Sequence, residues 1–235
     1  MKLKQKGDVT LLVVVTVIAI GVAVLAVAGA QLGSWELEDA YRDIAAAAEV
    51  SAFLGAISTV GGLLWISATA IALFSGWLLT TLDRQREGRF LIYFGLLTLL
   101  LAVDDTFQIH EDVLGQIPTV GQPLYILIYG GLALAFVYFQ RELIKGEHVL
   151  TFIAAVGFLA ISAITDNLRD LSSFASLIEQ SGAAKPLEVM FFLLEDTAKL
   201  IGILLWLGYA VQKAGQFLRD RSNQPVGADN SSAGD

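Results

Sequence analysis

The chain has 235 residues, of which 55% are hydrophobic, and its formal net charge at pH 7 is −8. Because it contains no cysteine, disulfides, thiolate metal sites, cysteine nucleophiles and iron–sulfur clusters are excluded. The negative charge argues against nucleic acid or an anionic lipid surface as a partner.

The apolar residues form six runs separated by short polar pieces. Each run is close to the ~20 residues that a helix needs to cross ~30 Å of hydrocarbon. None shows the alternation with period two that barrel strands require, and helices satisfy every backbone hydrogen bond inside lipid. The sequence therefore predicts an all-α fold, a polytopic membrane protein with a six-transmembrane-helix bundle. Its spans cover residues 10–32, 52–82, 90–112, 124–139, 149–168 and 187–211.

Lysine and arginine residues set the predicted orientation of the bundle. Of the 15 such residues, only Arg42, Arg169 and Lys185 fall on one side, Lys199 lies within the last span, and all the others fall on the opposite side. Since positively charged loops stay in the cytoplasm, both termini are predicted to be cytoplasmic and the protein to lie in the cell membrane. The first run could also be read as a signal peptide, but its length favours a retained anchor.

Residues 1–221 are predicted to form a single transmembrane domain. Within it, residues 34–50 carry Trp35 and Tyr41 beside five acids, which predicts an amphipathic segment on the outer membrane surface. Residues 222–235 are rich in Gly, Ser, Asn and Asp and predict a disordered cytoplasmic tail. The glycine pairs at 61–62 and 130–131 predict close contacts between helices.

Carboxylates interrupt three of the predicted spans. Asp104 and Asp105 follow the apolar run FLIYFGLLTLLLAV, and Asp166 is near the end of the fifth span. Glu195 and Asp196 lie inside the sixth. With a helical rise of ~1.5 Å per residue, all of these acids fall at overlapping depths in the outer half of the bilayer. A charge at membrane depth costs at least ~2.5–3.5 kcal/mol, so the cluster either has cationic partners or is a functional site.

Helical periodicity refines the predicted pocket. At ~100° per residue, Asp104, Gln108 and Glu111 form one stripe, with Asp105 on its flank. His110 points away from this stripe and joins the site only if the span ends in a tighter turn. The sequence thus predicts a pocket between spans three, five and six that binds a cation or a proton. Its candidate metal ligands are Asp104, Asp105, His110, Glu111, Asp166, Glu195 and Asp196, with Lys199 and Arg169 as charge partners and Gln108 and Asn167 as polar lining.

One interpretation of this cluster is a structural salt-bridge network in a non-catalytic accessory or assembly subunit. Lys199 follows Glu195 by four residues and Asp196 by three, which is the spacing of ion pairs on one helix. Arg169 can pair with Asp166 in the same way. The acids nevertheless outnumber these cations, and a surplus of buried negative charge needs bound cations or protonation.

The preferred interpretation is cation or proton handling, as in transport. Carboxylates and side-chain amides are oxygen ligands of the type that Ca²⁺, Mg²⁺ or Mn²⁺ prefers, and intramembrane acids beside a lysine are common in proton relays. Two features count against transport: the chain shows no internal repeat, and the inner half of the bundle offers no ionisable residue to continue a path. The bilayer is the expected partner, and a homo-oligomer or a larger membrane complex is also compatible with the sequence.

A third interpretation is a metal-dependent, membrane-embedded hydrolase acting near the outer leaflet. Carboxylates and one histidine can hold a metal such as Zn²⁺ with an open position, and a further carboxylate can act as general base on its bound water. The motifs of soluble hydrolases and kinases are absent. The ligands would be Asp105, Asp166, Glu195 and either His110 or Glu111, with Asp196 or Asp104 as the base.

Overall fold

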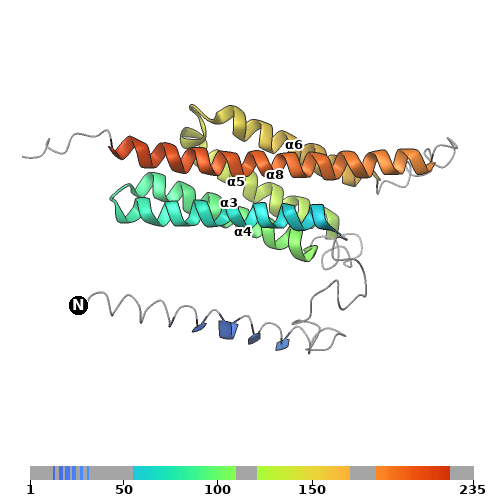
Figure 1. Ribbon diagram of the computed structural model, residues 1–235, viewed down its shortest axis with the longest axis horizontal. Coiled ribbons are helices and arrows are strands. Elements are labelled where there is room, and N and C mark those ends of the chain that lie inside the picture. The colour runs from blue at the N-terminus through green and yellow to red at the C-terminus, as the bar shows by residue number, and fades with distance from the viewer. Residues whose placement is uncertain are drawn as a thin grey trace, which may run out of the picture. The chain divides into compact units, whose positions relative to one another are not determined.

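The computed structural model describes residues 55–109, 121–169 and 184–222, together with isolated positions between Val13 and Gln31. All regular secondary structure in these residues is helical. The chain divides into two units, Met1–Ala56 and Ile57–Asp235, and the packing described below lies within the second. Figure 1 shows its helices: α3 (Ala56–Thr81), α4 (Gln85–Phe107), α5 (Gly121–Ile144), α6 (Val149–Arg169) and α8 (Ala184–Ser222).

Four segments of these helices are long and apolar enough to cross a membrane. They are Ala56–Thr81, Gln85–Phe107, Leu127–Ile144 and Val149–Asp166. They coincide with predicted spans two to five, so this part of the predicted all-helical fold is confirmed. α8 is one helix of 39 residues, which contains predicted span six and continues past it to Ser222. The described positions between Val13 and Gln31 are helical and fall in predicted span one.

α4 ends earlier than the third predicted span. Its last residue is Phe107, and Gln108 adopts the left-handed conformation (φ 48°, ψ 39°) with its backbone N–H donating to the carbonyl of Asp104. A left-handed residue ends a helix because it turns the chain out of the helical path. The regular stripe predicted from Asp104 through Gln108 to Glu111 therefore stops after Phe107.

α3 and α4 form a hairpin whose backbones touch. A Cβ atom on Gly76 would lie 2.8 Å from the carbonyl oxygen of Gly88, so only glycine permits this approach. The predicted close contact at Gly130 and Gly131 is not found, since a Cβ at either position would meet nothing within 4 Å in the described part of the chain. The other predicted pair does face neighbouring helices, since a Cβ on Gly61 would lie 3.4 Å from Ile203 of α8 and one on Gly62 would lie 3.7 Å from Thr106 of α4.

α6 and α8 run antiparallel and lie side by side (Figure 1). A Cβ on Gly202 would lie 2.8 Å from Cγ of Leu159, so α6 approaches α8 closely there. Seven residues further along α8, the ring of Tyr209 lies 5.1 Å from that of Phe152, seven residues back along α6. This register fixes which residues of the two helices lie at the same level.

An aromatic layer fills the interior where α3, α4, α6 and α8 meet. The Trp206 indole stacks on Phe94 with ring centroids 4.7 Å apart and meets Trp65 edge-on at 6.1 Å. Its Nε1–H donates to the Thr98 hydroxyl at 2.9 Å, and Phe152 packs against it at 5.7 Å. A buried indole whose N–H has a partner contributes apolar burial without leaving a donor unpaired.

Candidate acid–lysine site

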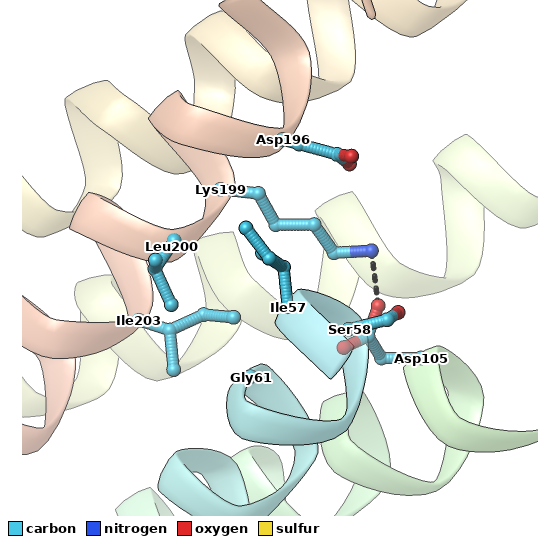
Figure 2. A pocket seen from close by; sticks show the side chains of 8 residues that line it. All are labelled: Ile57, Ser58, Gly61, Asp105, Asp196, Lys199, Leu200 and Ile203. Carbon is cyan, nitrogen blue, oxygen red and sulfur yellow. Dashed lines mark ion pairs between the residues drawn. The ribbon is translucent and has the colours of Figure 1, made fainter. Parts of the chain in front are cut away.

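An ion pair joins α4 to α8. Asp105 lies in the last turn of α4 and Lys199 in the first half of α8, and the Lys199 ammonium contacts the Asp105 carboxylate (Figure 2). The Asp105 side chain is 13% exposed and the Lys199 side chain 38%. The sequence predicts ion pairs of Lys199 within its own helix, whereas this one connects two helices.

The ion pair lines a small pocket. Its space of about 20 Å³ suffices for one water molecule. Asp196 lines the same pocket, and Figure 2 shows its carboxylate on the same side of α8 as the Lys199 side chain, with no ion pair drawn to it. The described lining thus carries two carboxylates and one ammonium. The other lining residues are Ile57, Ser58, Gly61, Leu200 and Ile203.

The charges of this lining do not balance. With Asp105, Asp196 and Lys199 all ionised, the pocket carries one net negative charge beside mostly apolar neighbours. Carboxylates that share a site of low polarity favour a state in which one of them is protonated or a cation is bound. A proton bound at this pocket therefore neutralises it.

Asp104 faces a different helix from Asp105. Asp104 is only 6% exposed, and its Oδ1 accepts a hydrogen bond of 2.9 Å from the hydroxyl of Tyr129 on α5. Adjacent helical residues point ~100° apart, which explains why the two aspartates contact different neighbours. Tyr129 is not among the site residues that the sequence predicts. The signal for it is a phenol hydroxyl in an apolar span, which needs a polar partner when half-buried.

Asp166 and Glu195 lie at one level of the α6–α8 pair. The register set by Leu159 and Gly202 places them opposite each other, one turn further from the aromatic layer than Lys199. Both are half-buried, and each takes part in an interaction of its own. Neither is among the described residues that line the pocket with Asp105.

Several predicted site residues, or their side chains, lie outside the part of the chain that the structure describes. These are His110 and Glu111, together with the side chains of Asn167 and Arg169. Gln108 ends α4, as described above. Within residues whose placement is described, no group of three or more His, Asp or Glu side chains is arranged to hold a metal ion. The set of candidate metal ligands named from the sequence therefore stays a prediction.

A comparison with known protein families finds one that matches most of the chain. Residues 11–213 match a family described as Domain of unknown function (DUF8692). The chain belongs to this family. The matched region contains the acid–lysine pocket and ends at Lys213 of α8. No curated protein and no solved structure matches the chain. The functional inference for this DUF8692 protein therefore comes from the chemistry of its own residues.

Proposed function

We propose that this DUF8692 protein is a six-span cell-membrane protein that binds and moves a proton at the acid–lysine pocket. Four apolar helices and the one-sided distribution of Lys and Arg support the membrane arrangement with cytoplasmic termini. In that orientation the pocket lies toward the outer side. We call the end of the bundle where α3 and α8 begin the outer end, and the opposite end the inner end.

The observation that carries the proposal is the Asp105–Lys199 pair with Asp196 on the same pocket. Burying charged groups is costly, and ionisable side chains inside a membrane bundle mark ion or proton sites more often than packing sites. The Lys199 ammonium already occupies the position that a bound cation would take beside Asp105. A proton, which needs only a carboxylate, fits the remaining charge better than a metal ion.

A structural network is the second candidate, and specific contacts favour it. The bond from Tyr129 to Asp104 and the pair between Asp105 and Lys199 together tie α4 to both α5 and α8. Polar contacts of this kind stabilise membrane bundles, though usually by only ~0.6 kcal/mol each. The network predicts that the acids can be replaced with a loss of stability alone. The hydrolase interpretation has no contact in the described residues that favours it.

The test is proton flux through liposomes that contain the purified full chain and an internal pH-sensitive dye. We expect Asp105→Asn to lower the flux by about 100-fold, the usual worth of a positioned proton-transfer group. The matched control is Glu142→Gln, which removes a carboxylate that is 60% exposed and pairs with Arg141 and Lys145. It should leave the flux unchanged.

Two results would contradict the proposal. The first is a wild-type protein that moves no protons under a pH gradient or a membrane potential of either sign. The second is an Asp105→Asn protein that keeps its full flux and loses only thermal stability, which is the outcome that the structural network predicts.

A further inference from the structure

Lys213 is a buried lysine in the inner part of α8 that the acid–lysine pocket does not use. It is only 2% exposed, and its Nζ donates to Gln216 Oε1 at a long 3.3 Å. The ammonium also lies over the Phe217 ring, 5.4 Å from the centroid. Within the described residues no carboxylate oxygen lies within 4.0 Å of it. A buried ammonium with one long hydrogen bond and one ring contact releases its proton more readily than an ammonium in water.

Two other buried polar atoms of the α6–α8 pair have no hydrogen-bond partner among the described residues. The hydroxyl of Tyr209, one helical turn earlier on α8, is fully buried and has no hydrogen-bond partner among the residues that the structure describes. The register of Phe152 against Tyr209 places His148, at the start of α6, level with Lys213. The Nε2 atom of His148 is also buried, has no hydrogen bond within the described part of the chain, and lies 4.0 Å from Oε2 of Glu147. Three groups that can hold or pass a proton therefore gather at the inner end of the α6–α8 pair.

The charges around Lys213 favour a proton over an anion as the ligand. Glu147, beside His148, and Asp220, further along α8, act on Lys213 from two sides. Asp220 also acts on Arg84, which pairs with Glu87 where α4 begins. Burial lowers the pKa of Lys213, and the two acids oppose this effect. An added anion would meet Glu147 and Asp220, whereas a proton leaving Lys213 relieves the burial of its charge.

We propose that Lys213 is a second proton-binding site of this protein, which exchanges its proton with the cytoplasmic side through His148. The proposal rests on the proposed function and extends it to the inner end. Lys213 and His148 are not hydrogen-bonded to each other in the structure. In each exchange the flexible Lys213 side chain therefore brings its ammonium to Nε2 of His148, the imidazole accepts the proton, and it then gives a proton to water. An imidazole is suited to this step because one ring nitrogen can accept a proton while the other donates one.

The aromatic layer explains why this site would exchange inward. Lys199 and Lys213 lie 14 residues apart on α8, a distance of about 21 Å along the helix axis. Trp206 is midway between them and is packed by Phe94 and Phe152. Close-packed rings leave no room for a file of water molecules. In this conformation a proton path from either lysine therefore leads to the side of the membrane nearer to it.

The first experiment reads the titration of Lys213 directly, in full-length protein labelled with ¹³C at lysine Cε and held in lipid nanodiscs. Lys213→Met assigns its signal, and Lys145, whose side chain is 69% exposed, is the internal reference. We expect Lys213 to titrate at lower pH than Lys145. If the two titrate together, or Lys213 stays protonated where Lys145 has lost its proton, the proposal is overturned.

The second experiment is the liposome flux assay. Lys213→Met and Lys213→Arg should both lower the flux by about 100-fold, and His148→Asn should lower it too, while Lys145→Met leaves it unchanged. A merely structural lysine would tolerate either the apolar or the permanently charged replacement. If Asp105→Asn stops the flux and both Lys213 variants keep it, the inner site is wrong and the outer one stands. If the wild type shows no flux, the proposed function fails, and the titration alone decides whether Lys213 holds an exchangeable proton.

Discussion

The two lysines of α8 share a helix and a face but have opposite surroundings. Lys199, at the outer end, is 38% exposed and contacts the Asp105 carboxylate beside a pocket with room for water. Lys213, at the inner end, is 2% exposed, and the described residues give its ammonium one long hydrogen bond to Gln216 and the face of the Phe217 ring. Lys199 is in direct contact with a carboxylate, whereas Glu147 and Asp220 act on Lys213 without forming an ion pair with it among the described residues.

This difference shows that burial and pairing act separately on an ionisable group. A partner of opposite charge holds the proton on a lysine, whereas burial without one loosens it. Lys199 thus has a direct partner for its charge, whereas burial lowers the pKa of Lys213. Four substitutions would break or sharpen this contrast.

The largest effect is expected at Gly202, which sets the register of α6 on α8. Gly202→Val would put its Cβ 2.8 Å from Cγ and 3.0 Å from the backbone nitrogen of Leu159. We expect a loss of about 3 kcal/mol in the free energy of unfolding, measured by SDS titration in mixed micelles. Gly208→Val is the matched control, because a Cβ there meets nothing within 4 Å among described atoms. Equal losses in the two variants would show that the close α6–α8 contact is not present.

The second effect differs in sign between the lysines. Lys199→Met leaves the Asp105 carboxylate without its cation and should destabilise the protein by about 2 kcal/mol, less than for a fully buried pair because Lys199 is partly exposed. Lys213→Met removes a buried charge that has no carboxylate partner, and should be neutral or stabilising by about 1 kcal/mol. The thermal midpoints of both variants, measured beside the wild type, test the contrast.

The effect of Lys213→Met should also depend on pH. Because burial lowers the pKa of Lys213 in the folded protein, the unfolded chain binds more protons above that pKa. Wild-type stability therefore rises with pH from the folded pKa up to the ordinary lysine pKa. The advantage of the methionine variant should shrink over the same range. A constant difference at every pH would mean that Lys213 keeps its proton equally in both states.

The smallest effect is expected for Tyr129→Phe. It deletes the hydroxyl that donates to Asp104 and keeps the ring, so we expect a loss of about 1 kcal/mol in the free energy of unfolding. Proton flux should stay within a factor of about two of the wild type, since Asp104 and the pocket face different helices. A strong fall in flux would place Asp104 in the proton site together with Asp105.

Much of the helical fold follows from the sequence, and so does the choice of Asp105, Asp196 and Lys199 as residues that lie near one another. The acidic pair Asp104 and Asp105 follows a run of fourteen mostly apolar residues, and Lys199 lies inside an apolar span. Such charges can be recognised in a sequence because they are costly in lipid. The ion-pair partner of Lys199 cannot be derived from the sequence in this way. Spacing along one helix suggests Glu195 or Asp196, whereas the contact with Asp105 depends on how α4 and α8 are packed.

Packing also explains why some residues have a different role in the structure from the one that the sequence indicates. Lys213 counts as one of the cytoplasmic charges that orient the chain, and its burial follows only from the approach of α6 to α8. A sequence signal does exist, because Lys213 lies seven residues beyond Trp206 and fourteen beyond Lys199, on one helical face. Likewise, Gly76 and Gly88 are isolated in the sequence, and only the hairpin brings them together.

The continuity of α8 has a mechanical consequence. At 3.6 residues per turn, positions 199 and 213 lie about 40° apart around the helix axis, and an unbroken helix transmits rotation along its whole length. A twist of α8 that drew Lys199 away from α4 would swing Lys213 in the same sense, in the same movement. Both lysines would change neighbours together, although the rings between them stay closed to water.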